Sequence, residues 1–147
     1  MRDKVKILVV DDQMAVALMM VFLLTRAGCD AQAALDAEKT LRLAQTEMFD
    51  LITLDIDLPG TNGFEIYRRL KKLPCCCDTP IIFVSGRPYD EDRQRAFELG
   101  AVDYIVKPFE VTDFVFRIKS HAKAKSRPSD VPDENPDPDT QSLCNTP

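Results

Sequence analysis

Short apolar runs alternate five times with longer stretches of helical spacing along the chain. The apolar runs have the length of buried β-strands and cover residues 5–10, 29–35, 51–55, 81–84 and 102–106. The stretches with helical spacing cover residues 13–27, 36–47, 64–72, 90–99 and 110–122. Strands separated by helices of this length indicate right-handed crossovers and a parallel sheet covered on both faces. The pattern therefore predicts an α/β fold.

A few residues mark where these elements begin and end. Gly28 and Gly100 follow the first and fourth helices, where a left-handed residue commonly closes a helix. Asp36 precedes the second helix as an N-cap residue does. The third apolar run contains one polar residue, Thr53, which predicts a strand buried on both faces. We interpret residues 59–63 as the loop that leads into the third helix.

The composition changes after residue 122. Five of the ten prolines fall in the last twenty residues, with several acids and almost no large apolar side chains. Such a segment buries too little surface to offset the entropy cost of ordering it. We therefore expect one folded domain over residues 1–122 and a disordered, acidic, proline-rich tail or linker over residues 123–147. The sequence does not separate a free tail from a linker to a further domain.

Length and charge restrict the classes of function. The 147 residues suffice for one domain with a sizeable core, and 45% of them are hydrophobic, as in soluble globular proteins. A net charge of −5 argues against direct binding to nucleic acid, which depends on clustered Lys and Arg. The longest apolar run, residues 14–24, is about half as long as a membrane span. Because no signal-peptide pattern is evident either, we expect a cytoplasmic protein.

The cysteines do not form a recognisable metal site. Five are present, and they lack the paired spacing of zinc ligands. Three of them are adjacent, at residues 75–77, and are poorly placed to bridge one another. From the sequence we assign them no structural role.

Carboxylates and a lysine stand at the ends of the predicted strands. Asp11 and Asp12 follow the first strand and Asp55 ends the third, while Ser85 and Lys107 follow the fourth and fifth. In open parallel sheets the ligand crevice lies outside the carboxyl ends of the strands. Clustered carboxylates repel one another, which a hard cation relieves, and an all-oxygen ligand set favours Mg²⁺. Lys107 adds a charge, and Ser85 a hydroxyl, for phosphoryl oxygens.

Each of these residues also has a structural explanation when it is taken alone. Asp12 can cap a helix, Asp55 can hold a turn, Ser85 can sit in a loop and Lys107 can be solvated. Their shared position at strand ends favours a metal-assisted phosphoryl site instead.

Four motifs together resemble the receiver domain of two-component response regulators. They are Asp11-Asp12, the segment 55–63, Ser85-Gly86 and the segment 104–109, in that order. The resemblance covers about residues 4–122. It implies a doubly wound, flavodoxin-like (βα)5 fold with strand order 2-1-3-4-5. It also implies a phosphorelay signalling domain, not an enzyme with an external substrate, that accepts a phosphoryl group from a sensor histidine kinase or histidine phosphotransfer protein.

The resemblance further assigns roles in phosphorylation. By motif position Asp55 is the phosphoacceptor, and Lys107 and Ser85 are partners of the phosphoryl oxygens. Ser85 and Tyr104 form the switch, in which the aromatic ring turns inward when the hydroxyl moves toward the phosphate. The Lys107–Pro108 bond is expected to be cis.

The implied metal site uses the acidic residues around the acceptor. Asp12 and Asp55 are the side-chain ligands of Mg²⁺, the backbone carbonyl of Asp57 completes the protein set, and Asp11 acts largely through water. Asp57 and Arg87 occupy positions that in the family tune the lifetime of the phosphate. Their opposite charges would allow them to pair across the mouth of the pocket.

The first predicted helix is apolar on all sides, whereas a surface helix usually has one apolar stripe. With the packing of the family, the residues that face the sheet are Val16, Met19, Met20 and Leu23. The residues left outward are Met14, Leu18 and Val21, with Phe22 at the margin. We predict that this methionine-rich face docks the helical partner that donates phosphate. The alternative is that the tail or the last helix covers it.

Two other functions share some of these features. A haloacid-dehalogenase-type phosphatase also has an acid pair like Asp55 and Asp57, but there the pair ends the first strand. A non-phosphorylated interaction module would be marked by a lost acceptor or lysine, and both are present. The output is open: the domain acts alone, or it acts on an effector or a second copy through the face of the fourth helix, fifth strand and fifth helix.

Overall fold

The computed structural model describes residues 4–125 of the chain. Its main strands are β1 (Lys6–Val10), β2 (Asp30–Ala34), β3 (Leu51–Leu54), β6 (Ile81–Ser85) and β7 (Asp103–Val106). Its helices are α1 (Met14–Arg26), α2 (Ala37–Thr46), α3 (Gly63–Lys71), α4 (Asp90–Leu99) and α5 (Val111–Lys125). Each predicted element is therefore present. The predicted tail lies outside the described residues from residue 126 onward.

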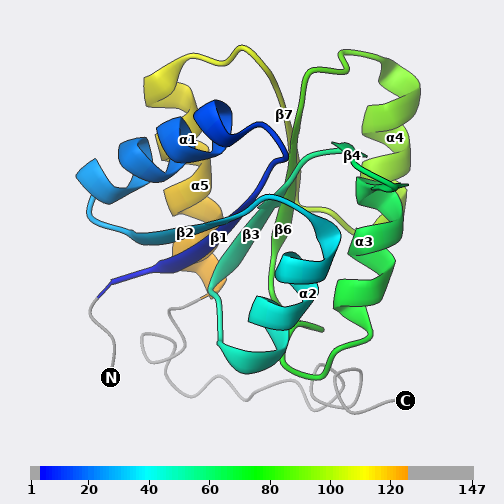
Figure 1. Ribbon diagram of the computed structural model, residues 1–147. Coiled ribbons are helices and arrows are strands. Elements are labelled where there is room, and N and C mark those ends of the chain that lie inside the picture. Colours follow the sequence, from blue (N-terminus) through cyan, green and yellow to red (C-terminus); the bar gives the residue numbers. More distant parts are fainter. Residues whose placement is uncertain (1–3, 126–147) are drawn as a thin grey trace.

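The five main strands form one parallel sheet in the order β2-β1-β3-β6-β7. In sequence order of these strands this is 2-1-3-4-5, so the predicted fold class and strand order are confirmed. Figure 1 shows α1 and α5 on one face of the sheet and α2, α3 and α4 on the other. The order reverses between β1 and β3, which places a crevice at the carboxyl ends of these two strands.

Two apolar layers fill the space between the sheet and the helices. One layer contains the buried side chains of α1 and α5, and the other those of α2, α3 and α4. The central strand β3 is buried along its whole length, as its apolar sequence predicted. Within residues 4–125, no helix combines the length and the apolar composition that crossing a bilayer requires.

The predicted element ends agree closely with the structure, with two differences. Asp36 caps α2 by accepting a hydrogen bond from the backbone N–H of Lys39 at 2.8 Å, and Gly28 and Gly100 have positive φ after α1 and α4. The segment interpreted as a loop contains a small antiparallel hairpin, β4 (Asp57–Leu58) and β5 (Thr61–Asn62). In addition, α5 continues to Lys125 instead of ending near residue 122.

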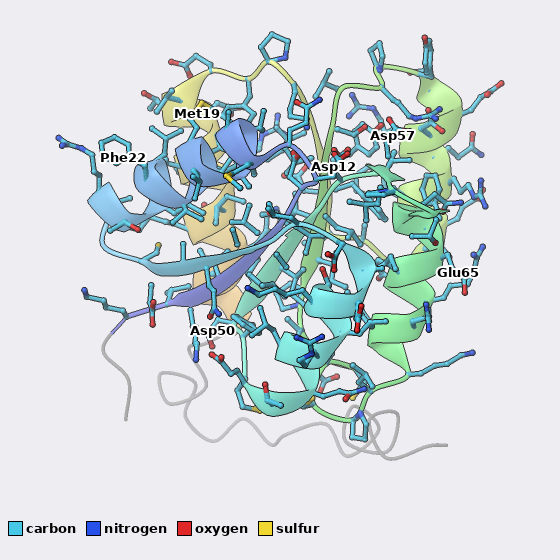
Figure 2. The ribbon with its side chains drawn as sticks, viewed as in Figure 1. Asp12, Met19, Phe22, Asp50, Asp57 and Glu65 are labelled. Atoms are coloured by element: carbon cyan, nitrogen blue, oxygen red, sulfur yellow. The ribbon has the colours of Figure 1, made fainter. Side chains whose placement is uncertain are left out.

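The orientation of α1 differs in part from the prediction. Met20 is buried, and Val16 and Leu23 pack against the same core, as expected. Met19, which was expected to face the sheet, is 44% exposed, and Figure 2 shows it projecting away from the sheet together with Phe22. Val21, expected outward, is half-buried against the core.

The remaining outward face of α1 is large and apolar. Its most exposed side chains are Met14 (58%), Leu18 (54%) and Phe22 (57%). The guanidinium of Arg26 lies 5.6 Å from the centroid of the Phe22 ring, at the far end of this face. The face therefore contains Met14, Leu18, Met19 and Phe22, and not Val21.

Candidate functional site

Backbone hydrogen bonds between neighbouring strands bring three charged residues to one edge of the sheet. The N–H of Asp55 donates to the carbonyl of Val10 at 3.1 Å, directly after β3. The N–H of Lys107 donates to the carbonyl of Ser85 at 2.8 Å, directly after β7. These strand ends place Asp11, Asp55 and Lys107 side by side at the switch point of the sheet.

The lysine joins the two buried carboxylates. Its Nζ lies 2.7 Å from Oδ2 of Asp11 and 3.3 Å from Oδ2 of Asp55. Asp11 and Asp55 are both buried, so these ion pairs are poorly screened by solvent. The peptide bond between Lys107 and Pro108 is cis, as the sequence resemblance implied.

Burial and charge act in opposite directions on these groups. Burial raises the pKa of Asp55, which the Lys107 ammonium counteracts and the Asp11 carboxylate reinforces. Burial by itself lowers the pKa of Lys107, but its hydrogen bond to Asp11 and the two nearby carboxylates outweigh that effect and raise it. Lys107 is therefore a fixed positive charge beside a carboxylate whose negative charge is costly to bury.

The same edge has the composition of a site for a hard cation. Carboxylate oxygens of Asp11, Asp12 and Asp55 all lie within 4.8 Å of one another. Three carboxylates against one ammonium leave an excess of negative charge, and a divalent cation would balance it. An oxygen-only set with one exposed member, Asp12, matches Mg²⁺, which keeps several of its waters.

A second set of contacts connects the site to Tyr104. The backbone N–H of Arg87 donates to Oγ of Ser85 at 3.1 Å, and the Tyr104 hydroxyl donates to the carbonyl of Arg87 at 2.6 Å. Ser85 and Tyr104 are both buried, and Arg93 of α4 lies 5.3 Å from the centroid of the tyrosine ring. The loop at Arg87 therefore joins the hydroxyl beside the acidic site to the aromatic ring of β7.

The family model of the response regulator receiver domain matches residues 7–119. The chain belongs to this family. The receiver domain fold accounts for both the sheet order and the acidic edge. The match argues against the haloacid-dehalogenase alternative, because it spans most of the chain and not only the acid pair at Asp55 and Asp57.

Curated relatives share the receiver domain over part of their length. The chain is 38% identical to the transcriptional activator protein IrlR of Burkholderia pseudomallei, over 78% of this chain and 49% of that protein. It is 36% identical to the alkaline phosphatase synthesis transcriptional regulatory protein PhoP of Bacillus subtilis, over 78% and 47%. The chain thus spans about half the length of the curated relatives it matches.

Solved receiver domains have the same architecture. A CheY-like response regulator receiver domain protein of Methanospirillum hungatei is similar with a TM-score of 0.79 and 28% identity, covering 86% of this chain and 99% of the other. The chemotaxis protein CheY4 of Vibrio cholerae is similar with a TM-score of 0.76 and 28% identity, covering 80% and 98%. The likeness covers nearly the whole of each of these two solved chains and at least 80% of this one.

An ion pair crosses the mouth of the receiver site. Nη2 of Arg87 lies 2.9 Å, and its Nε 3.2 Å, from Oδ1 of Asp57, and Nη1 lies 3.7 Å from Asp92 of α4. Figure 2 shows Asp57 and Asp12 at the same edge of the sheet, with Asp50 at the opposite one. The pairing that the charges of Asp57 and Arg87 allowed is therefore present, and both side chains are exposed.

Gly63 has a role at the site that was not predicted from the sequence. It begins α3, and its N–H donates to the carbonyl of Ile56 at 2.7 Å. A Cβ at this position would overlap the backbone carbonyl oxygen of Asp55. Only glycine therefore lets α3 approach the backbone of Asp55 this closely. One residue in the sequence could have indicated that α3 begins at Gly63. This residue is Asn62, whose side chain accepts a hydrogen bond from the N–H of Glu65 and so caps the helix.

Proposed function

We propose that this receiver domain accepts a phosphoryl group on Asp55 and thereby changes a surface that partner proteins recognise. The observation that carries the proposal is the position of the Lys107 ammonium, 3.3 Å from an Asp55 oxygen and 2.7 Å from Asp11. That arrangement offers a nucleophilic carboxylate with a fixed cation beside it. Catalysis of phosphoryl transfer rests mostly on such positioning and electrostatics.

The proposed chemistry is a single in-line displacement followed by hydrolysis. An oxygen of Asp55 forms a bond to phosphorus while the bond from phosphorus to the donor histidine nitrogen breaks, and the imidazole leaves. Lys107 and the hydroxyl of Ser85 stabilise the negative charge on the phosphoryl oxygens. Water later removes the phosphoryl group from the acyl phosphate and restores the Asp55 carboxylate. The domain thus promotes its own modification and is not an enzyme with turnover of an external substrate.

The proposed cofactor is Mg²⁺, which receiver domains typically use. Asp12 and Asp55 would hold the ion with their side chains and Asp57 with its backbone carbonyl, while Asp11 would act through bound water. The ion supplies positive charge for the transferring phosphoryl group. The cluster of three carboxylates around one ammonium supports this assignment.

The proposed switch uses Ser85 and Tyr104. Their link through the loop at Arg87 supports a route from the acceptor to the face formed by α4, β7 and α5. We infer that an effector protein or a second copy binds there, and that the donor, a sensor histidine kinase or histidine phosphotransfer protein, binds at α1. The net charge of −5 supports protein partners and not direct contact with nucleic acid, and a cytoplasmic location follows from such partners.

Labelling with acetyl phosphate tests the acceptor. Wild-type protein is expected to gain one acid-labile, hydroxylamine-sensitive phosphate in the presence of Mg²⁺, located on the peptide that contains Asp55. Asp55→Asn should abolish this gain, and Lys107→Ala should slow it on the order of a hundredfold, because a preorganised charge is lost. Asp50→Asn is the matched control, since Asp50 lies at the opposite edge of the sheet and should label normally.

The outcomes separate the remaining alternatives. If Asp55→Asn still incorporates phosphate, the acceptor is another residue. If folded wild-type protein incorporates none, the domain is an interaction module that works without phosphorylation.

Docking at α1 is tested by Leu18→Glu. Leu18 is 54% exposed in the centre of the apolar face, so a charge there should weaken binding of a helical donor on the order of tenfold or more. Transfer from the cognate histidine donor should slow, whereas labelling by acetyl phosphate should not. Met48→Glu, at a residue 62% exposed next to α2, serves as the control. Equal slowing with both phosphate sources would remove α1 as the docking face.

A further inference from the structure

Two neighbouring thiols converge on one carbonyl oxygen at the end of α2. Sγ of Cys75 lies 2.8 Å from the carbonyl oxygen of Ala44, and Sγ of Cys76 lies 3.9 Å from the same atom. Both thiols are free, Cys75 is half-buried and Cys76 is buried. No structural role was predicted for these residues, yet their contacts with Ala44 attach the segment between α3 and β6 to α2.

The two thiols also interact with each other. Burial, the charge of the adjacent Cys75 and a hydrogen bond between the two thiols together raise the pKa of Cys76 to about 12. Cys76 therefore remains a neutral thiol near pH 7. Among the described residues, no further His, Cys, Asp or Glu joins the pair, so the two thiols do not form the four-ligand set of a structural Zn²⁺ site.

We propose that Cys75 and Cys76 form a binding site for trivalent arsenicals. Such compounds react with thiols by condensation and need no prior thiolate. With an arsenoxide, two S–H bonds break, two As–S bonds form, and the oxygen leaves with the two protons as one molecule of water. Arsenic stays trivalent and no electrons are transferred. The convergence of two sulfur atoms on one point supplies the two bonds that a stable complex requires.

The arsenical is expected to react first with the half-buried thiol of Cys75. Cys75 is the more accessible of the two, and its condensation would bring the arsenic next to the buried sulfur of Cys76. The second bond then forms within one molecule, which strengthens retention by on the order of a hundredfold or more over a single thiol. The contacts of both sulfurs with Ala44 would be replaced in the complex.

This site is separate from the acidic edge. Cys75 and Cys76 precede β6, at the amino end of the strand, whereas Ser85 at its carboxyl end borders the acceptor site. Arsenical binding is therefore expected to leave acetyl phosphate labelling of Asp55 unchanged, and the two proposals fail or succeed independently.

Intact-mass measurement of the full chain with phenylarsine oxide tests the proposal. Protein kept reduced with a phosphine is treated with one equivalent of the arsenical and then with excess monothiol. Wild type should retain one phenylarsenic group, which an added 1,2-dithiol removes. Cys75→Ser and Cys76→Ser should each lose this retention, because one thiol cannot hold arsenic against competing thiol.

Two control variants and a folding measurement complete the test. Cys29→Ser removes a buried thiol on the other face of the sheet. Cys77→Ser replaces the next residue along the chain, whose sulfur lies 3.4 Å from the carbonyl of Pro74 and not at Ala44. Both should retain the group. Circular dichroism should show Cys75→Ser folded, since serine can still donate to Ala44. No retention by wild type, or retention by folded Cys75→Ser, would overturn the proposal.

Discussion

Replacing Thr53 by valine is expected to stabilise this receiver domain. Thr53 lies in the middle of β3 with no exposed surface, beside Val9 of β1 and Ile82 of β6. Among the described residues, its Oγ1 has no hydrogen-bond partner. A buried hydroxyl without a partner has lost its bonds to water on folding and has gained none in return. Valine has nearly the same shape and carries no polar atom.

The size of the effect follows from the burial of the group. A buried polar group left unsatisfied costs about 1–3 kcal/mol, and the methyl group adds a small gain in apolar burial. Part of this gain is offset because a methyl is slightly larger than a hydroxyl in a closely packed core. We therefore expect the free energy of unfolding to rise by about 1–2 kcal/mol.

A second buried threonine provides the matched control. Thr40 of α2 is as fully buried as Thr53, but its Oγ1 donates to the carbonyl of Asp36 at 2.8 Å. Thr40→Val should therefore lower the free energy of unfolding by about 0.5–1.5 kcal/mol. The same substitution at two buried sites is thus expected to have opposite signs, and the difference isolates hydrogen bonding.

Urea unfolding followed by circular dichroism measures both variants. With an m-value of roughly 1–3 kcal/mol per molar urea, Thr53→Val should raise the midpoint by about 0.3–2 M without changing the slope. A midpoint equal to or below that of the wild type, with Thr40→Val lowered as expected, would refute the reasoning. The hydroxyl of Thr53 would then have a partner in solution.

Two further predictions concern Gly63 at the start of α3 and the stability of the fold at alkaline pH. Gly63→Ala should destabilise the fold by roughly 1–3 kcal/mol in urea unfolding and should slow acetyl phosphate labelling, because its Cβ would displace the Asp55 backbone. Gly86→Ala has open space around its Cβ, so neither its urea midpoint nor its labelling rate should change. Burial raises the pKa of Tyr67 to about 12, so folding favours the neutral phenol. The contribution of this preference to the free energy of unfolding is complete below pH about 10 and is lost as the pH rises toward 12. Tyr67→Phe should flatten that loss in urea titrations.

The central strands of the sheet were predictable from their apolar sequences. A strand covered on both faces needs a nearly continuous apolar run, which residues 81–84 provide and residues 51–54 provide apart from Thr53. The residues at the element ends act locally: Asp36 reaches its own helix, and Gly100 supplies its own positive φ. Such signals depend on a few neighbours in sequence and are readable without the fold.

The rotation of α1 about its axis was not predictable in the same way. Polar residues normally mark the solvent side of a helix, and residues 14–24 contain none. The rotation is then set by the shape of the core, which leaves Met19 exposed and packs Val21 inward. The hairpin of β4 and β5 was not predicted, because two residues per strand are too few to show the alternation of polar and apolar side chains that marks a strand.

The acidic site falls between these two cases. The positions of Asp11, Asp55 and Lys107 follow from the rule that parallel strands end at one edge, so their convergence needed only the strand assignment. The contacts made by Arg87 could not be read in full, because they depend on the path of a loop. Its charge indicated a pairing with Asp57, but nothing in the sequence indicated that its carbonyl accepts from Tyr104.

That loop gives Arg87 an unusual position in the domain. Its side chain is paired with Asp57 beside the proposed acceptor, its N–H donates to the Ser85 hydroxyl, and its carbonyl accepts from the Tyr104 phenol. If Ser85 turns toward a phosphoryl group, as we propose, the N–H of Arg87 loses its hydrogen bond to the Ser85 hydroxyl, and we expect the Arg87 carbonyl that accepts from Tyr104 to shift with it. We therefore propose that the Asp55 site acts on the α4–β7–α5 face through the backbone of this one residue.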